Sequence, residues 1–294
     1  MQQRIRQLSL TILLALCAVG AHAMNPNAQA ELDAAFKEVG TALQSGPAPI
    51  TLTDQAILKL PKGYGFVPNP TATRLMRALG NHADERLLGL VLPLDNAQWM
   101  VVVKYEKSGY IKDDDAREWN ADDLYKSLLE GTEAGNEARK QAGITEIELT
   151  GWVEKPAYDA TTHRMVWSIG VKDKGVADNA PGVNYNTYVL GREGYISMNM
   201  ITDQSLVAQY KPATHELLAA LEFNGGKGYA DFNASTDKIA EYGLAALITG
   251  VAAKKLGMFA LMAAFFAKFF KAILLAGAGV LYGIKKWFGR DKES

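Results

Sequence analysis

Three consecutive aspartates form the densest group of side chains that could do chemistry in this sequence. Asp113, Asp114 and Asp115 stand in the segment "GYIKDDDAREW", directly before a predicted helix. Clustered carboxylates can ligate a hard divalent cation, or can act as acid and base with different pKa values. Consecutive residues of an extended chain point to opposite faces, however, so three in a row rarely converge on one ion. A solvated turn that leads into the helix is the structural alternative.

His163, in "YDATTHRMVWS", is the histidine best placed for acid–base chemistry. It follows Asp159 in an expected hairpin turn, where it could act as a general base or could bond within its own turn. No Gly-x-Ser-x-Gly elbow accompanies it, and "HELLA" at 215–219 lacks the second histidine of a zinc-protease helix. The candidate catalytic residues are therefore Asp113, Asp114, Asp115 and His163, and no metal or cofactor is expected.

The composition indicates an ordinary folded domain between two apolar ends. The chain has 294 residues, a formal net charge of −1 and 48% hydrophobic residues. Such a balance offers no charge excess for a nucleic acid, so we expect no nucleic-acid partner. The single cysteine, Cys17, lies in the N-terminal apolar run, so a chain cut after that run holds no thiol for catalysis or metal binding.

Residues 1–23 have the form of a secretory signal peptide. Two arginines precede a short apolar run, and Ala21 and Ala23 supply the small residues of a cleavage site. The run is short for a membrane span. An uncleaved N-terminal anchor and an acylated Cys17 are the alternatives. We expect cleavage after Ala23 and export of a globular domain over residues 24–235.

The hydrophobic periodicity of this domain predicts an α+β fold. Helical patterns cover residues 26–44, 71–79, 120–143 and 212–222, whereas strand patterns occur at 50–68, 87–106, 144–153, 164–172 and 184–202. Asn120 is the expected N-cap of the third helix. The strongest hairpin, at 184–202, turns at Gly191-Arg192-Glu193-Gly194. We expect a mainly antiparallel sheet with the helices packed on one side, followed by membrane-associated helices at the C-terminus.

Residues 236–287 are apolar but punctuated by lysines, which predicts a membrane anchor. A span needs about 20 apolar residues, and only thirteen uncharged residues separate Lys271 from Lys285. Extension toward the N-terminus includes Lys268 and Lys271, whose ammonium groups could reach the headgroups from near the end of a span. The lysines expected at the membrane interface are Lys254, Lys255, Lys268, Lys271, Lys285 and Lys286.

A single C-terminal span is the expected arrangement, with the chain before residue 268 lying along the membrane surface. A hairpin with Lys268 and Lys271 at its tip is one alternative, and a soluble buried helix is another. The basic tail, residues 288–294, favours the cytoplasm. The domain would then face the periplasm from the inner membrane, with the lipid bilayer as its partner. Gly279 and Gly283 could pack two helices into a homo-oligomer, although glycine is common in spans.

Several segments carry a resemblance to a known family. They are "LKLPKGYGF", "GYIKDDDA", "LEGTEAGNEAR", "PAYDATTHRMVWS", "VNYNTYVLGREGYISMN" and "YADF", followed by the lysine-punctuated apolar tail. In this order they resemble an uncharacterised bacterial family, the domain of unknown function 2167, described as predicted membrane-anchored proteins. The resemblance covers the chain from about Gly46 onward. It implies a bacterial origin, an envelope location and membrane attachment, and it implies no activity or catalytic residue.

Three functional hypotheses follow, of which the first is a non-enzymatic module that faces the periplasm and binds a ligand or an envelope protein. It is suggested by a well-patterned domain with an anchor and no convincing catalytic set. The second is a metal-dependent or acid–base hydrolase that uses the aspartates at 113–115 and His163. The third is a bilayer-active or oligomerising membrane protein. The distances between the aspartates and His163 test the second hypothesis.

Overall fold

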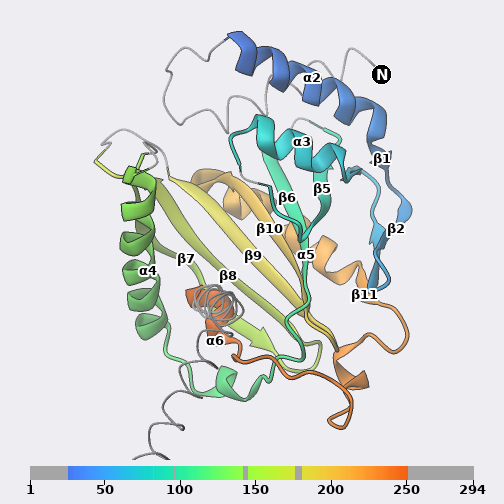
Figure 1. The fold of residues 1–294 in the computed structure, drawn as a ribbon, viewed down its shortest axis with the longest axis vertical. Coiled ribbons are helices and arrows are strands. Elements are labelled where there is room, and N and C mark those ends of the chain that lie inside the picture. Colours follow the sequence, from blue (N-terminus) through green and yellow to red (C-terminus); the bar gives the residue numbers. More distant parts are fainter. Residues whose placement is uncertain (1–25, 82, 96, 142–144, 176–180, 251–294) are drawn as a thin grey trace, which may run out of the picture. The chain divides into compact units, whose positions relative to one another are not determined.

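A computed structural model describes residues 26–81, 83–95, 97–141, 145–175 and 181–250 (Figure 1). The helices are α2 (Pro26–Ala42), α3 (Thr71–Ala78), α4 (Ala121–Gln141), α5 (Val207–Ala219) and α6 (Ala245–Thr249). The strands are β1 (Gln44–Ser45), β2 (Ala48–Leu52), β3 (Ala56–Leu60), β4 (Tyr64–Pro68), β5 (Leu87–Pro93), β6 (Trp99–Glu106), β7 (Ile147–Asp159), β8 (Arg164–Asp173), β9 (Gly182–Leu190), β10 (Tyr195–Asp203) and β11 (Leu221–Phe223). This order of elements confirms the α+β class.

Two antiparallel sheets organise the described part of the chain. Eight strands form the larger sheet in the order β1-β4-β5-β6-β10-β9-β8-β7, and β11-β3-β2 form the smaller one. Strand β6 pairs with β10, far along the chain, so that Val102 lies opposite Asn199. Because paired residues of antiparallel strands point to the same face, this register decides which side chains share each face of the sheet.

One face of the larger sheet is covered at both ends by helices. At one end, α2 and α3 pack on strands β4 to β6, with Leu32, Leu75 and Leu90 almost fully buried. At the other end, α4 and α6 pack on β7 and β8, with Met165 and Leu244 fully buried. The amphipathic patterns at 26–44, 71–79 and 120–143 therefore correspond to real helices. Asn120 accepts the Asp122 amide at 2.8 Å, which confirms it as the N-cap of α4.

The opposite face is covered by α5 and the smaller sheet. Leu217 and Leu58 are both fully buried there, against Val101 and Met198 of the larger sheet. The expectation that all helices pack on one side is therefore wrong, since α5 lies across the sheet from α2, α3, α4 and α6. This helix also begins at Val207, five residues before the start that the sequence suggested.

The folded unit continues to Thr249, beyond the boundary expected at residue 235. Ala240, Leu244, Leu247 and Ile248 are buried in the cluster under α4, and Tyr110 forms a bridge with Ile239. The membrane anchor was expected to start at residue 236, whereas the structure keeps the chain in the folded unit up to Thr249. An apolar segment satisfies a protein core as well as a bilayer, so composition alone misplaced this boundary.

Several expectations lie outside the described residues. They are the signal peptide with Ala21 and Ala23, the interface lysines Lys254, Lys255, Lys268, Lys271, Lys285 and Lys286, the glycines Gly279 and Gly283, and the tail at 288–294. Among the helices that the structure describes, none is long and apolar enough to cross a membrane.

Candidate functional site

The end of the β7–β8 hairpin brings Asp113 and His163 into one cluster. The Tyr158 hydroxyl donates a hydrogen bond to Asp113 Oδ2 at 2.7 Å and lies 3.0 Å from His163 Nδ1. His163 Nδ1 is 3.8 Å from the same carboxylate oxygen. Since a phenol has one proton and gives it to the carboxylate, Nδ1 of His163 acts as the donor to the phenol oxygen.

Aromatic rings pack around this cluster and bury it in part. The ring of His163 lies 4.0 Å from that of Tyr229, which stacks on Tyr110 at 4.4 Å. The Tyr229 hydroxyl donates to the carbonyl of Ile111 at 2.8 Å. Burial, and then the hydrogen bond to the Asp113 carboxylate, raise the pKa of Tyr158, so its phenol stays protonated at neutral pH. The cluster therefore ties residues 110–113 and Tyr229 to the end of the hairpin.

The other two aspartates point elsewhere. Asp115 accepts the backbone amides of Leu244 and Ala245 at 3.0 Å each, so it caps the first turn of α6 from a distant part of the chain. Asp114 is exposed. The three carboxylates therefore do not converge on one ion, and no group of three or more potential metal ligands occurs in the described ranges. The exposed Asp114 fits the alternative of a solvated turn, whereas Asp115 serves α6, a helix far along the chain.

The Asp113–Tyr158–His163 cluster could move a proton between a carboxylate, a phenol and an imidazole. The distance between Asp113 and His163 is compatible with the hydrolase hypothesis. The cavities beside α3, beside α5 and beside Arg74 are lined by other residues, however. The geometry therefore supplies an acid–base pair, and none of these three cavities in the described residues lies against it.

A second candidate site lies on strands β9 and β10. Asn184 and Asn186 of β9 and Ser197 and Asn199 of β10 point to the face that the helices cover at its two ends. We call these four residues the amide strip. Figure 1 shows β9 and β10 between the strands on which α3 packs and the strands on which α4 packs. Asn186 is 8% exposed, and the other three side chains are half-buried.

The register puts the amide strip between two apolar borders. Asn199 lies opposite Val102 on β6, and Asn186 lies opposite Trp167 on β8. Both of these neighbours are buried, one in the cluster under α3 and the other in the cluster under α4. The reverse face of the same two strands is apolar, with Tyr185 and Met198 fully buried. Because buried apolar residues lie on both sides of the strip, the presence of polar side chains on it needs an explanation other than core packing.

The hydrogen-bonding capacity of the amide strip is largely unused within the described residues. The Asn186 side-chain NH₂ donates to the carbonyl of Asn184 at 3.1 Å. The Asn199 Oδ1 atom is buried and accepts no hydrogen bond from a described residue. A buried polar atom without a partner costs about 1 to 3 kcal/mol. Asn199 Oδ1 is one of five such side-chain atoms among the described residues, and the one that lies on the amide strip.

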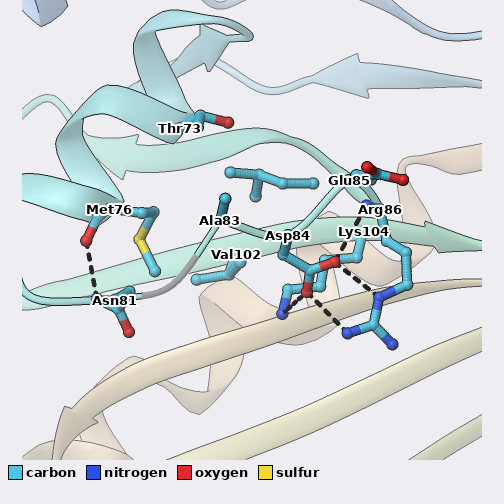
Figure 2. Close-up of a pocket in the computed structure, with 10 residues that line it drawn as sticks. Thr73, Met76, Asn81, Ala83, Asp84, Glu85, Arg86, Val102 and Lys104 are labelled. Carbon is cyan, nitrogen blue, oxygen red and sulfur yellow. Dashed lines mark hydrogen bonds and ion pairs between the residues drawn. The ribbon is translucent and has the colours of Figure 1, made fainter. Parts of the chain in front are cut away.

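A cavity of about 510 Å³ lies between α3 and β6, the strand next to β10 in the sheet. Val102 and Lys104 line it, and their partners on β10 are Asn199 and Ser197. Figure 2 shows Asp84 in this cavity between Arg86 and Lys104. Asp84 Oδ1 accepts from Arg86 Nε at 2.7 Å, and Lys104 Nζ lies 2.8 Å from Asp84 Oδ2.

Both cations that line the cavity, Arg86 and Lys104, are paired with carboxylates. Besides Asp84, the Arg86 guanidinium contacts Glu106 Oε2 at 3.0 Å. Burial alone would raise the pKa of Asp84, but hydrogen bonds from Arg86 and Lys104 outweigh it and hold this pKa below its usual range. Asp84 is therefore ionised, and both cations already have a carboxylate partner.

Asp84 should contribute to the pH dependence of stability. Because its pKa is lower in the folded chain, its contribution is present above pH ~4, the unfolded value, and is lost as the pH falls below that value. We expect Asp84→Asn to lower the free energy of unfolding at pH 7 by about 1 kcal/mol, allowing for solvent screening. The loss of stability on acidification below pH ~4 should become shallower.

The measurement is urea denaturation of the full chain at several pH values. Glu85→Gln is the matched control, because its side chain is exposed and forms no ion pair with a described residue. Equal pH profiles for Asp84→Asn and the unsubstituted chain would show that the Asp84 network is not coupled to folding.

Sequence reasoning overlooked the amide strip and the cavity beside it. The signal was present in "NYNT" and "SMNM", where polar side chains alternate with buried ones at a period of two. Alternation of this kind also occurs on any strand with one solvated face. Only the pairing of Asn186 with Asn199, and the covered strands on either side, distinguish the strip from such a face.

Comparison with known proteins gives a family and similar solved structures. The model of a family described as protein of unknown function, DUF2167, matches residues 44–278, a range that includes both sheets. The chain is similar to the solution structure of cyanobacterial PsbP (CyanoP) from Synechocystis sp. PCC 6803, with 12% identity and a TM-score of 0.36 over 62% of this chain and 93% of that chain. None of the curated proteins compared with the chain matches it. Because the family match extends over most of the chain, this protein belongs to the DUF2167 family of proteins of unknown function.

Proposed function

We propose that this protein is a non-enzymatic binding module whose binding surface is the amide strip with the cavity beside α3. The observation that carries the proposal is the buried Asn199 Oδ1 atom, which has no hydrogen-bond partner among the described residues. It lies on a strip of polar side chains between two packed clusters. A binding partner would supply the hydrogen bonds that the fold leaves unmade. Small-molecule sites have this form, with a few convergent polar groups beside a preformed cavity.

The proposed location is the periplasmic face of the inner membrane, with the C-terminal segment as the tether. Support comes from the signal-peptide pattern of residues 1–23 and the lysine-punctuated apolar run that continues beyond the described fold. A tether would raise the effective concentration of the module near envelope proteins and other envelope components. A soluble carrier would have no use for such an anchor.

The hydrolase hypothesis keeps one favourable observation, the 3.8 Å contact between Asp113 and His163. Two observations count against it. Asp115 is engaged in the cap of α6, and the Tyr158 hydroxyl already forms hydrogen bonds with both Asp113 and His163. We therefore place it second. The third hypothesis, oligomerisation or action on the bilayer through Gly279 and Gly283, rests on the sequence pattern alone.

Photo-crosslinking in intact cells tests the proposed function. A photo-reactive amino acid replaces Ser197 in the full chain, and a second chain carries it at Gln209, an exposed amide residue on α5. We expect a defined adduct from position 197, recovered with the membranes, and a different or absent adduct from position 209. Recovery of the chain with soluble material would contradict the tether. Identical products from the two positions would contradict the binding surface.

A further inference from the structure

We infer that the amide strip binds a neutral, polyhydroxylated ligand, a glycan chain in chemical terms. The inference rests on the proposed function, because it assigns a ligand class to the same surface. Three properties of the surface support it: the hydrogen-bonding groups of the strip, the pairing of the neighbouring charges, and the tyrosines at one end.

The side chains of the strip can both donate and accept hydrogen bonds. An asparagine amide offers two donors and an acceptor, and a serine hydroxyl offers both roles. Asn186 and Asn199 lie opposite each other on neighbouring strands, so their amides are close enough to act on one ligand. A sugar hydroxyl can donate to an amide oxygen of the strip while it accepts from an amide NH₂. The side chains of an apolar segment could not satisfy these groups.

The charges beside the strip disfavour an anionic ligand. Lys104 is the cation nearest in register, because it lies opposite Ser197, and its ammonium is 2.8 Å from Asp84. Arg86 is shared by Asp84 and Glu106. A phosphate or carboxylate ligand would have to displace these carboxylates, whereas a neutral ligand can bind without breaking either ion pair.

Aromatic side chains border the strip next to Ser197. Tyr188 lies opposite Ser197 on β9, and its ring contacts that of Tyr195 edge to face, with the centroids 5.6 Å apart. Both phenols are protonated at neutral pH, as an ordinary tyrosine is, and burial raises the pKa of each further. A tyrosine combines an apolar ring with a polar tip, and the two sides of a sugar ring present the same combination of C–H and O–H groups.

The length of the strip suits an extended ligand. Asn184 and Tyr188 are four residues apart on β9, which corresponds to about 13 Å along a strand. This length exceeds one sugar ring, and the cavity of about 510 Å³ beside α3 extends the surface sideways from Val102. A linear oligosaccharide is therefore a better fit than a monosaccharide.

Binding of neutral oligosaccharides to the full chain tests the inference. The chain is purified in a polyoxyethylene detergent, whose headgroup carries no sugar, and titrated calorimetrically with chitohexaose, cellohexaose and maltohexaose. We expect saturable binding of at least one of them. Asn199→Ala and Asn186→Ala should each weaken it at least tenfold, which corresponds to about 1.4 kcal/mol. Gln209→Ala, which removes an amide from the opposite side of the fold, should leave the affinity unchanged.

A stability measurement separates a ligand-binding role from a structural one. Asn199→Leu removes the buried amide oxygen that has no partner among the described residues. Its thermal midpoint should therefore equal or exceed that of the unsubstituted chain while oligosaccharide binding is lost. A clear fall in the midpoint would show that Asn199 is needed for folding and would overturn the inference.

The remaining outcomes distinguish the ligand class from the surface. If no neutral oligosaccharide binds but position 197 still forms its adduct in cells, the ligand class is wrong and the proposed function stands. If position 197 gives no adduct either, both are wrong. Binding that persists in both asparagine variants would place the oligosaccharide elsewhere. A crosslink from position 197 to residues 251–294 of the same chain would show that the chain itself covers the strip, and would overturn the inference.

Discussion

Gly194→Ala should lower the free energy of unfolding by about 3 kcal/mol. Gly194 directly precedes β10, has a φ of 155°, and accepts the Gly191 amide at 2.8 Å. A Cβ atom at this position would lie against the carbonyl oxygen of Glu106, well inside contact distance, and close to the Ser108 nitrogen. These are backbone atoms, so they cannot rotate away as a side-chain tip could.

The consequence extends to the pairing of β6 with β10. Glu106 lies opposite Tyr195 in that ladder, so moving its carbonyl disturbs the contact that joins the two halves of the larger sheet. Chemical denaturation of the full chain, followed by tryptophan fluorescence, measures the change. Gly225→Ala is the control, because nothing lies within 4 Å of its Cβ position. If the two variants lost the same free energy of unfolding, the close approach of Gly194 to the Glu106 carbonyl would not limit the side chain at this position.

Leu217→Ala should cost about 2 to 5 kcal/mol of stability. Leu217 is 0% exposed and lies in α5, where it packs in the core between the larger sheet and the smaller sheet. Removing three carbon atoms from a closely packed interior loses burial energy and leaves a cavity that the neighbours fill only in part. A large effect is expected because α5 is one of only two layers that cover this face in the described part of the chain.

Leu129→Ala is the matched control for this experiment. Leu129 lies on α4 and is 38% exposed, so its truncation should change the free energy of unfolding by less than about 1 kcal/mol. The same denaturation measurement applies to both variants. If Leu217→Ala were as mild as Leu129→Ala, α5 would be a loosely attached element, and the two-sided architecture would not hold in solution.

Local pattern was enough to predict most of the elements. The helices at 26–42 and 121–141 follow from apolar residues at helical spacing and, for α4, from the Asn120 cap. The β9–β10 hairpin follows from the alternation on both sides of Gly191–Gly194. In each case the determining interactions lie within a few residues, so the information is contained in the segment itself. The α+β class follows from the same elements.

The candidate sites depended on contacts between distant segments. Asp113 and His163 were both singled out, yet Tyr158, 45 residues from Asp113, is the residue that joins them. Asp115 resembled a helix-start residue of its own segment but caps α6, 129 residues away. The amide strip became visible only when β6, β10, β9 and β8 were placed in order.

The sequence by itself determined which segments form helices and strands, because periodicity and capping act over a few residues. The tertiary structure alone decided which face each side chain occupies and what surrounds it. Ala240, Leu244, Leu247 and Ile248 illustrate the difference. Their apolar side chains suit a bilayer and a protein core equally, and packing in the cluster under α4 places them in the core. Burial is a property of the neighbours that a fold assembles, and local composition does not contain it.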